Sequence, residues 1–296
     1  MDYFEIIFLC FAFALGAILG SFACCQARRL HAREEAPGPK TPSKSPSKNS
    51  SSKTPSGKSA RKPSPYGRRS ICEHCKRQLS WYENIPIFSW LFLKGRCKKC
   101  HEKIGLTELF SEFGLGLATL FLSLKFWPAL SAASGPLPFI SFALLIVIFT
   151  GLTICFVYDA LWGHFPSFVL YILIALSAVF LALEYLSGSH IELLGLLADI
   201  GILPGLYYIL YIFSREKLVG SGDWLLCLPF ALILHNFWLC FFVLFLANIL
   251  AVFVQLPVTI LSKKKSHQFP FGPFLIIAFL VVFLFQETIM SIVTWS

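Results

Sequence analysis

Residues 137–158, LPFISFALLIVIFTGLTICFVY, form one apolar run without a charged side chain, and this run decides the class of fold. As an α-helix it would be roughly 30 Å long, the thickness of the hydrocarbon core of a bilayer. The whole chain is 56% hydrophobic and 14% charged, whereas soluble proteins are about a quarter charged. Seven more apolar stretches lie near 3–25, 106–124, 165–186, 192–213, 222–235, 237–261 and 270–293. The sequence therefore predicts an all-α polytopic membrane protein with about eight transmembrane helices.

The basic residues are concentrated in one loop. Residues 26–105 hold 19 of the 25 Lys and Arg but only 5 of the 16 acidic residues. By the positive-inside rule this loop is cytoplasmic. Eight spans then place the bases of 214–221 and 262–269 on the same side, leave only Lys125 outside, and put both termini outside. Nucleic-acid binding is the weaker interpretation of the charge, because no basic groove interleaved with aromatic residues accompanies it.

Four regions follow from this pattern. Residues 1–25 are the first transmembrane helix. Residues 26–70, rich in Lys, Pro and Ser, cannot bury enough apolar surface to fold and are predicted to be a disordered linker. Anionic membrane lipids are a minor candidate partner for this linker. Residues 71–105 form a small cytoplasmic module, and 106–296 form a seven-helix membrane core.

The module contains two C-x-x-C pairs, Cys72 with Cys75 and Cys97 with Cys100. Their spacing is typical of a zinc ribbon, in which two tight turns each supply two thiolates to a tetrahedral site. Disulfides are the alternative, and a reducing cytoplasm disfavours them. Since four cysteines fill the coordination shell of Zn2+, the predicted metal is structural and not catalytic.

Two acidic residues lie at the edges of apolar runs. Asp159 ends the 137–158 run, and Asp223 completes Gly220-Ser221-Gly222-Asp223 before another run. A carboxylate at a membrane edge is costly and indicates a functional site. The predicted topology puts both at the cytoplasmic edge, where they can meet if their helices pack side by side. Two close carboxylates share one proton, so that one activates water and the other donates to a carbonyl. The alternative for Asp223 is a helix cap.

These features together resemble the prepilin peptidase family, the membrane aspartic proteases that process type IV prepilins and related pseudopilins. The chain departs from the usual pattern at Leu225, where the family has a lysine. The matching segments are Gly20-Ser21-Phe22, residues 81–90 and 94–97, Glu112, Asp159 with Pro166, the G-x-G-D signature at 220–223, and residues 269–274.

The resemblance implies an aspartic endopeptidase of the bacterial inner membrane that removes a basic leader peptide at the cytoplasmic face, with Asp159 and Asp223 as the catalytic pair. Family members with the zinc-bearing loop also methylate the new N-terminus with S-adenosylmethionine, so this activity is a second expectation. Gly220 and Gly222 would let the backbone bend and approach the substrate, and Pro166 would begin the next helix.

The role of one further pair of acids stays open. Glu108 and Glu112 lie one helical turn apart. Glu112 is expected either to bind a charge on the substrate or to make a polar contact between helices. Asp199 and His235 are expected to satisfy local polar contacts.

Two other classes of function remain open. A transporter would place its acids near the bilayer midplane in repeated halves, and neither feature is found in the sequence. An inactive zinc-bearing scaffold for pilus or secretion assembly is the other alternative, and Leu225 gives it some support.

Overall fold

The computed structural model describes residues 3–35, 72, 74–75, 77–103, 105–189, 191–214, 219–261 and 270–294. Each predicted apolar stretch is helical. The helices are α1 (Tyr3–Glu34), α3 (Leu106–Ser131), α4 (Leu137–Trp162), α5 (Ser167–Leu186), α6 (Leu193–Ile200), α7 (Leu206–Ser214), α8 (Ser221–Leu234), α9 (Phe237–Leu261), α10 (Gly272–Leu284) and α11 (Gln286–Thr294). The π-helical turn η2 (Gly201–Gly205) joins α6 to α7.

Six or seven of the described helices are able to span a membrane, against the eight predicted. By length and composition, 6 of the described helices can cross a membrane, and α10 with α11 makes up to 7 if this pair, bent by 74°, is one span. The remaining apolar stretch is α8, which has only 14 residues. The predicted all-α membrane fold is confirmed for the described part of the chain. The basic residues at 215–217 and 263–265, which were predicted to be cytoplasmic, lie outside the described part of the chain.

The first helix is longer than predicted. α1 continues to Glu34, so residues 26–34 are not part of a disordered linker, and residues 36–70 of that linker lie outside the described part. The extension is stabilised by packing, because Ala27 is fully buried and lies in one apolar cluster with Cys24 and with Val157 and Tyr158 of α4. Tertiary burial thus extends the helix through polar sequence.

Close approach of α1 to α3 explains the glycine in the first-helix motif. A Cβ atom on Gly20 would lie 2.4 Å from the backbone oxygen of Ser111, and one on Gly16 would lie 2.0 Å from Thr119 Oγ1. This four-residue spacing of small residues lets two membrane helices touch through their backbones. The contact holds the first half of α3 against α1.

The boundary predicted between residues 235 and 237 is confirmed. α8 ends at Leu234, and His235 adopts a left-handed conformation with φ 32°. The side chain of Asn236 then accepts a hydrogen bond from Leu239 N–H at 3.2 Å. Because Asn is a strong N-cap residue, this bond starts α9 directly after the turn.

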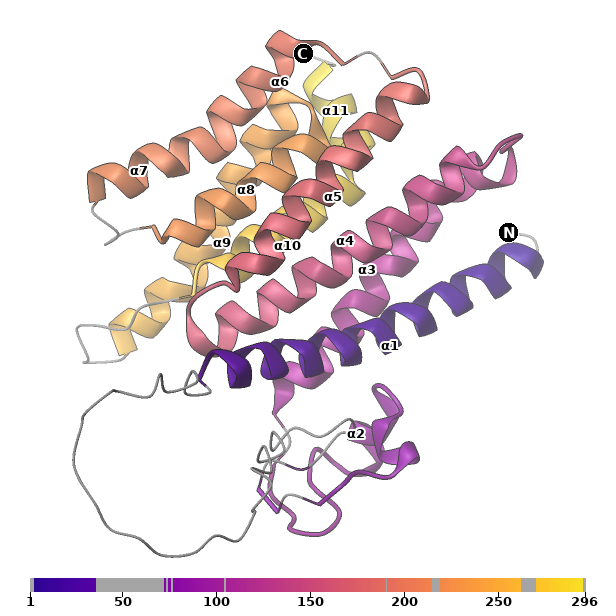
Figure 1. Cartoon of the computed structure of the whole chain (residues 1–296), viewed down its shortest axis with the longest axis vertical. Helices are drawn as coiled ribbons and strands as arrows, with labels where there is room; N and C mark the ends of the chain where they lie inside the picture. Colours follow the sequence, from indigo (N-terminus) through magenta and orange to yellow (C-terminus); the bar gives the residue numbers. More distant parts are fainter. Residues whose placement is uncertain are drawn as a thin grey trace, which may run out of the picture.

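The helices carrying the two aspartates are joined through their neighbours. α4 and α8 each pack on α5 and α10, so the aspartates meet through shared neighbouring helices and not through direct side-by-side packing of α4 on α8. Aromatic rings form the centre of this arrangement: Phe230 of α8 stacks on Phe279 of α10 at 4.2 Å, and Phe149 of α4 meets the same Phe279 edge-on at 6.5 Å. Figure 1 shows the end of α4 and the starts of α8 and α10 at one end of the bundle.

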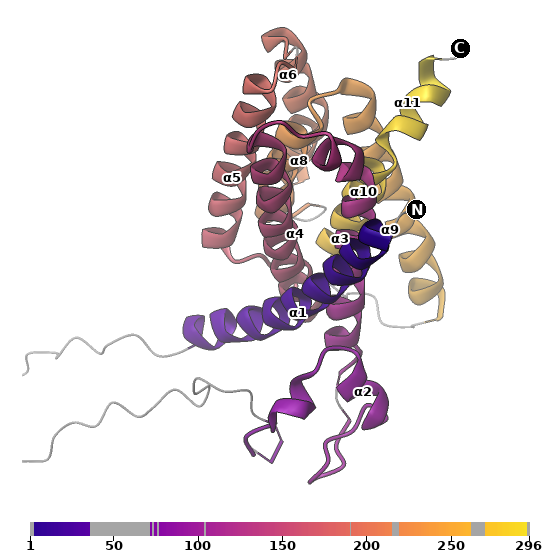
Figure 2. The ribbon, with the colours of Figure 1, turned by 90° about the vertical axis from the view of Figure 1, so that its right-hand side faces the viewer.

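The four-cysteine module lies outside the bundle. It contains the 3-10 turn η1 (Trp81–Asn84) and the short helix α2 (Phe88–Phe92). Both views of the chain place it next to the first turn of α3 and away from the two marked termini (Figures 1 and 2).

Candidate active site and metal module

The two aspartates predicted to be catalytic are buried at the same end of the bundle. Asp159 lies in the last turn of α4 and is 4% exposed, and Asp223 lies in the first turn of α8 and is 6% exposed. They are close enough for the charge of Asp223 to act on Asp159. The structure therefore brings together two acids that are 64 positions apart in the chain, although their helices do not pack mainly on one another.

Each carboxylate is held by a backbone N–H group. Gly272 N–H, in the first turn of α10, donates to Asp159 Oδ2 at 2.9 Å. Gly220 N–H donates to Asp223 Oδ2 at 2.9 Å. The second bond is a helix-capping contact of the kind proposed as the alternative role for Asp223. In both acids one oxygen is fixed, and among the described residues the other oxygen has no hydrogen-bond partner. Each acid therefore keeps one carboxylate oxygen that no described group occupies.

A phenylalanine ring and two glycines position the acids. A Cβ atom on Gly222 would lie 2.3 Å from Phe165 Cδ2. One on Gly272 would lie 2.2 Å from Phe165 Cζ and 2.8 Å from Asp159 Oδ2. Phe165 thus fills the space between the starts of α8 and α10. The sequence predicted a role for Gly222, but Phe165 and Gly272 were only quoted inside motifs.

The other residues predicted to support the site lie around it. Pro166 caps α5, and its carbonyl oxygen accepts a hydrogen bond from Val169 N–H at 2.9 Å. The prediction that it begins this helix is confirmed to within one residue. Leu225, at the position where a lysine was expected, packs against the apolar core. Its side chain is therefore stabilised by burial and not by a charge near the aspartates.

Glu108 and Glu112 have different partners. Glu112 is 8% exposed, and its Oε2 accepts a hydrogen bond from Ile87 N–H of the module at 2.7 Å. Ile87 has φ 63°, an unfavourable conformation for a β-branched residue. Glu108 forms an ion pair with Arg28 of α1 at 3.0 Å. Both acids therefore join α3 to other elements, which is the polar-contact alternative for Glu112, and a role of either in binding substrate stays a prediction.

The four cysteines of the module meet in space. All four Sγ atoms lie within 4.8 Å of one another, and Cys72 Sγ is 3.8 Å from Cys100 Sγ. A tetrahedron with Zn–S bonds of about 2.3 Å has edges of about 3.8 Å, so the donor set fits Zn2+. None of the four forms a disulfide. A metal bound here would have four protein ligands and no open position.

Backbone groups prepare one of these thiols for a metal. N–H groups of Cys100 and Lys99 lower the pKa of Cys97 to about 6, so this thiol ionises readily. Arg77 also interacts with Cys97. The same arginine forms a 2.6 Å ion pair with Glu83, whose carboxylate is nearly buried. Lys98, which directly follows Cys97, faces the Tyr82 ring at 5.4 Å. Arg77 was not singled out from the sequence.

Known proteins are similar to most of this chain. The model of the bacterial Peptidase A24 N-terminal domain matches residues 14–126. The prepilin leader peptidase/N-methyltransferase of Dichelobacter nodosus is 30% identical over 226 residues, covering 74% of this chain and 72% of that protein. The enzyme of the same name from Vibrio cholerae is 25% identical over 215 residues, covering 73% and 80%. A type 4 prepilin-like proteins leader peptide-processing enzyme of Escherichia coli is 45% identical over 60 residues, or 20% of this chain and 22% of that one. No solved structure matches. The chain belongs to the prepilin leader peptidase family.

Proposed function

We propose that this protein is a membrane aspartic endopeptidase that removes the basic leader peptide of type IV prepilins or pseudopilins, with Asp159 and Asp223 as its catalytic pair. The convergence of two buried acids at one end of the bundle carries the proposal. Membership of the family supports a peptidase, and the relatives from Vibrio cholerae and Dichelobacter nodosus are named for prepilin leaders.

The proposed chemistry needs only a shared proton and a water molecule. Two carboxylates that interact this closely do not both ionise readily, so the pair holds one proton. The ionised partner removes a proton from water as the water oxygen attacks the scissile carbonyl carbon, and the protonated partner donates to the carbonyl oxygen. The C–N bond then breaks, and the proton taken from water passes to the departing amine. The hydrogen bonds from Gly272 and Gly220 hold one oxygen of each acid in place. This leaves the other two oxygens for the reaction.

The proposed location of cleavage is the cytoplasmic face of the inner membrane. The basic loop at 26–105 places the module on that side by the positive-inside rule. The aspartates lie at the same end of the bundle as the module, and both termini then face the periplasm. The apolar helix of a prepilin can lie beside the spans while its basic leader stays in the cytoplasm.

Methylation of the new N-terminus is proposed as a second activity. Its support is the N-methyltransferase named in the relatives and the module with its four cysteines. In this proposal Zn2+ bound by these cysteines stabilises the module, and S-adenosylmethionine supplies the methyl group. No transfer of the methyl group through the metal is implied, because a four-cysteine site is closed.

The test is cleavage of a prepilin in reconstituted membranes by the wild type and by Asp159→Asn and Asp223→Asn. Each Asn side chain keeps an oxygen that can accept the backbone hydrogen bond, so the fold is expected to survive. Asp199→Asn is the matched control, because Asp199 is also a buried acid in a span, at 1% exposure. We expect cleavage to be lost in the first two variants and kept in the control. Cleavage that survives either catalytic substitution would exclude the pair.

Mass spectrometry of the product separates the two activities and the alternatives. A product heavier by one methyl group only when S-adenosylmethionine is added supports methylation. A wild type that cleaves none of several prepilins, while both Asn variants still support pilus assembly, would favour the scaffold.

A further inference from the structure

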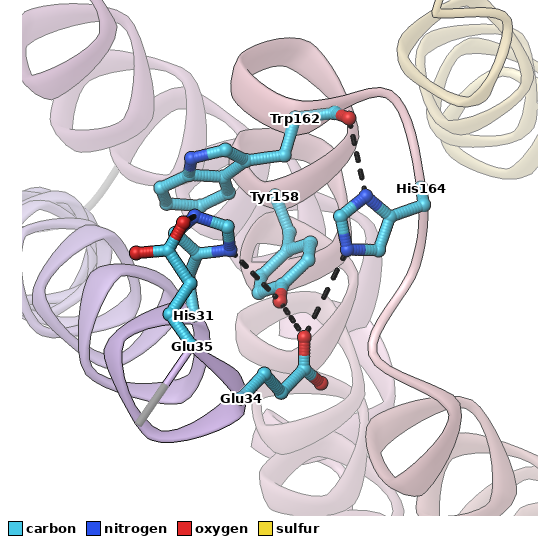
Figure 3. A network of polar contacts seen from close by, with 6 residues as sticks. All are labelled: His31, Glu34, Glu35, Tyr158, Trp162 and His164. Atoms are coloured by element: carbon cyan, nitrogen blue, oxygen red, sulfur yellow. Dashed lines mark hydrogen bonds and ion pairs between the residues drawn. The ribbon is translucent and has the colours of Figure 1, made fainter. Parts of the chain in front are cut away.

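A second group of metal-binding side chains lies at the end of α1, apart from the four cysteines. Figure 3 shows His31 and Glu34 of α1, and Glu35 directly after this helix, facing the last turn of α4 and the turn that follows it. The ligand atoms of His31, Glu34 and His164 lie within 4.8 Å of one another. Two aromatic residues of α4, Tyr158 and Trp162, complete the group. None of these residues was predicted to form a site.

Five polar contacts connect the group. Tyr158 O–H donates to Glu34 Oε2 in a short hydrogen bond. His31 Nε2 lies 3.3 Å from Glu35 Oε1, and His31 Nδ1 lies 3.4 Å from the Tyr158 hydroxyl oxygen. His164 Nδ1 lies 3.1 Å from Trp162 O, and His164 Nε2 lies 3.8 Å from Glu34 Oε2.

When both histidines are neutral, the group has fewer hydrogen atoms available for hydrogen bonding than it has polar contacts. Tyr158 supplies one hydrogen and each neutral imidazole supplies one. The Tyr158 hydrogen is used by Glu34. The Glu35 carboxylate and the Trp162 carbonyl can only accept hydrogen bonds. We therefore place the hydrogen of His31 on Nε2, which faces Glu35, and that of His164 on Nδ1, which faces Trp162 O. His31 Nδ1 and His164 Nε2 then present lone pairs to oxygen atoms. Both contacts become favourable when positive charge lies among these atoms, supplied either by a bound metal ion or by a second proton on each ring.

The arrangement matches the surroundings of a metal-binding histidine. Such a residue usually donates its other ring N–H to a carboxylate or a backbone carbonyl. Glu35 fills this role for His31, and the Trp162 carbonyl fills it for His164. A carboxylate ligand is usually hydrogen-bonded as well, and Tyr158 supplies that bond to Glu34. The Trp162 ring also stacks on His31 at 4.1 Å and fixes its orientation.

We propose that His31 Nδ1, His164 Nε2 and one carboxylate oxygen of Glu34 bind a single divalent transition-metal ion of the Zn2+ type. Two imidazoles and a carboxylate are a ligand set that Zn2+ accepts, with water in the fourth position. The ion can enter from the aqueous side, because the side chains of His164 and Glu34 are 53% and 52% exposed. The positive charge satisfies both lone-pair contacts at once.

The site would fix the turn that precedes α5. His164 lies next to Phe165, the ring that fills the space between Gly222 and Gly272. A metal bridging α1 and His164 would therefore hold the end of α1 against the turn beside the aspartates.

Metal counting on the full-length protein tests this proposal without any activity assay. The protein is purified in detergent with its affinity tag removed, its four-cysteine site is filled, and it is dialysed against micromolar Zn2+ at neutral pH. We expect two Zn2+ per chain in the wild type and one in His31→Gln and His164→Gln. The Zn2+ that remains in these variants reports that the cysteine module is folded. His235→Asn is the histidine control, since Asn tolerates its left-handed backbone, and it should keep two.

A fourth variant tests the hydrogen-bond partners of the ligands. Glu35→Gln leaves the three ligands intact and changes only the group that orients His31, so it should weaken the second Zn2+ by about tenfold. A wild type that binds one Zn2+ per chain would overturn the proposal. Binding of two Zn2+ by both histidine variants would overturn it equally.

Discussion

Replacing Gly222 by alanine should damage the site through one ring. The added Cβ would lie 2.3 Å from Phe165 Cδ2, whereas carbon atoms in contact are separated by about 3.5–4.0 Å. The ring must therefore move by more than about 1 Å, and it cannot move toward Gly272, where it is already in close contact. Overpacking of this kind costs about 1–3 kcal/mol. A misplacement of about 1 Å near the reacting groups lowers activity about 100-fold.

A control variant and a double variant test whether the Phe165 ring causes this effect. Gly114→Ala is the control, since nothing lies within 4 Å of its added Cβ, and it should leave thermal unfolding in detergent and prepilin cleavage near the wild type. Phe165→Leu removes the ring that clashes, so combining it with Gly222→Ala should cost less than the sum of the single changes by about 1 kcal/mol or more. The reasoning fails if Gly222→Ala behaves like Gly114→Ala, or if the two site substitutions are additive.

Two further outcomes concern the module. Glu112→Ala removes the acceptor of the Ile87 N–H bond, so amide exchange across residues 85–93 should rise while that of α4 and α8 stays unchanged. Glu112→Gln keeps an acceptor and should resemble the wild type, and equal exchange in both variants would show that the bond does not hold the module. Cys100→Ser removes one of four sulfurs, so metal analysis should find one Zn2+ fewer per chain and proteolysis should cut residues 77–103 faster. Unchanged zinc content would exclude these cysteines as the ligands.

The membrane helices could be predicted because each one meets the requirements of the lipid environment through its own sequence. A span in lipid must pair its own backbone groups and present apolar side chains, so its sequence is sufficient to reveal it. The turn at His235 was also predictable, since a polar His-Asn pair interrupts the apolar sequence locally. The end of α1 was not, because residues 26–34 are helical through burial of Ala27 against α4. That contact joins segments about 130 positions apart, and no local pattern reports it.

In the candidate site, too, features with a local sequence pattern could be predicted, and features that depend on tertiary contacts could not. The aspartates and the cysteines could be predicted because a charge in an apolar run and paired C-x-x-C motifs are rare in membrane sequences. The groups that hold them could not: Gly272 N–H is a backbone donor, and Phe165 resembles any apolar residue before a helix. Arg77 was missed for a different reason, since several bases lie near the cysteines and only the fold selects the one that pairs with Glu83.

The contacts around Asp159 indicate why cleavage would depend on distant parts of this chain. Its carboxylate is held by the first turn of α10, and the turn that follows it is packed by Phe165 against the start of α8. The module reaches the bundle at a different point, through the bond from Ile87 to Glu112 on α3. Glu108, one turn earlier on α3, pairs with Arg28 of α1, the same helix that ends at His31 and Glu34. Within the described part of the chain, a disturbance of the module therefore reaches the aspartates through α3 and α1. Loss of its metal should accordingly alter how a leader peptide is held more than the chemistry at the two acids.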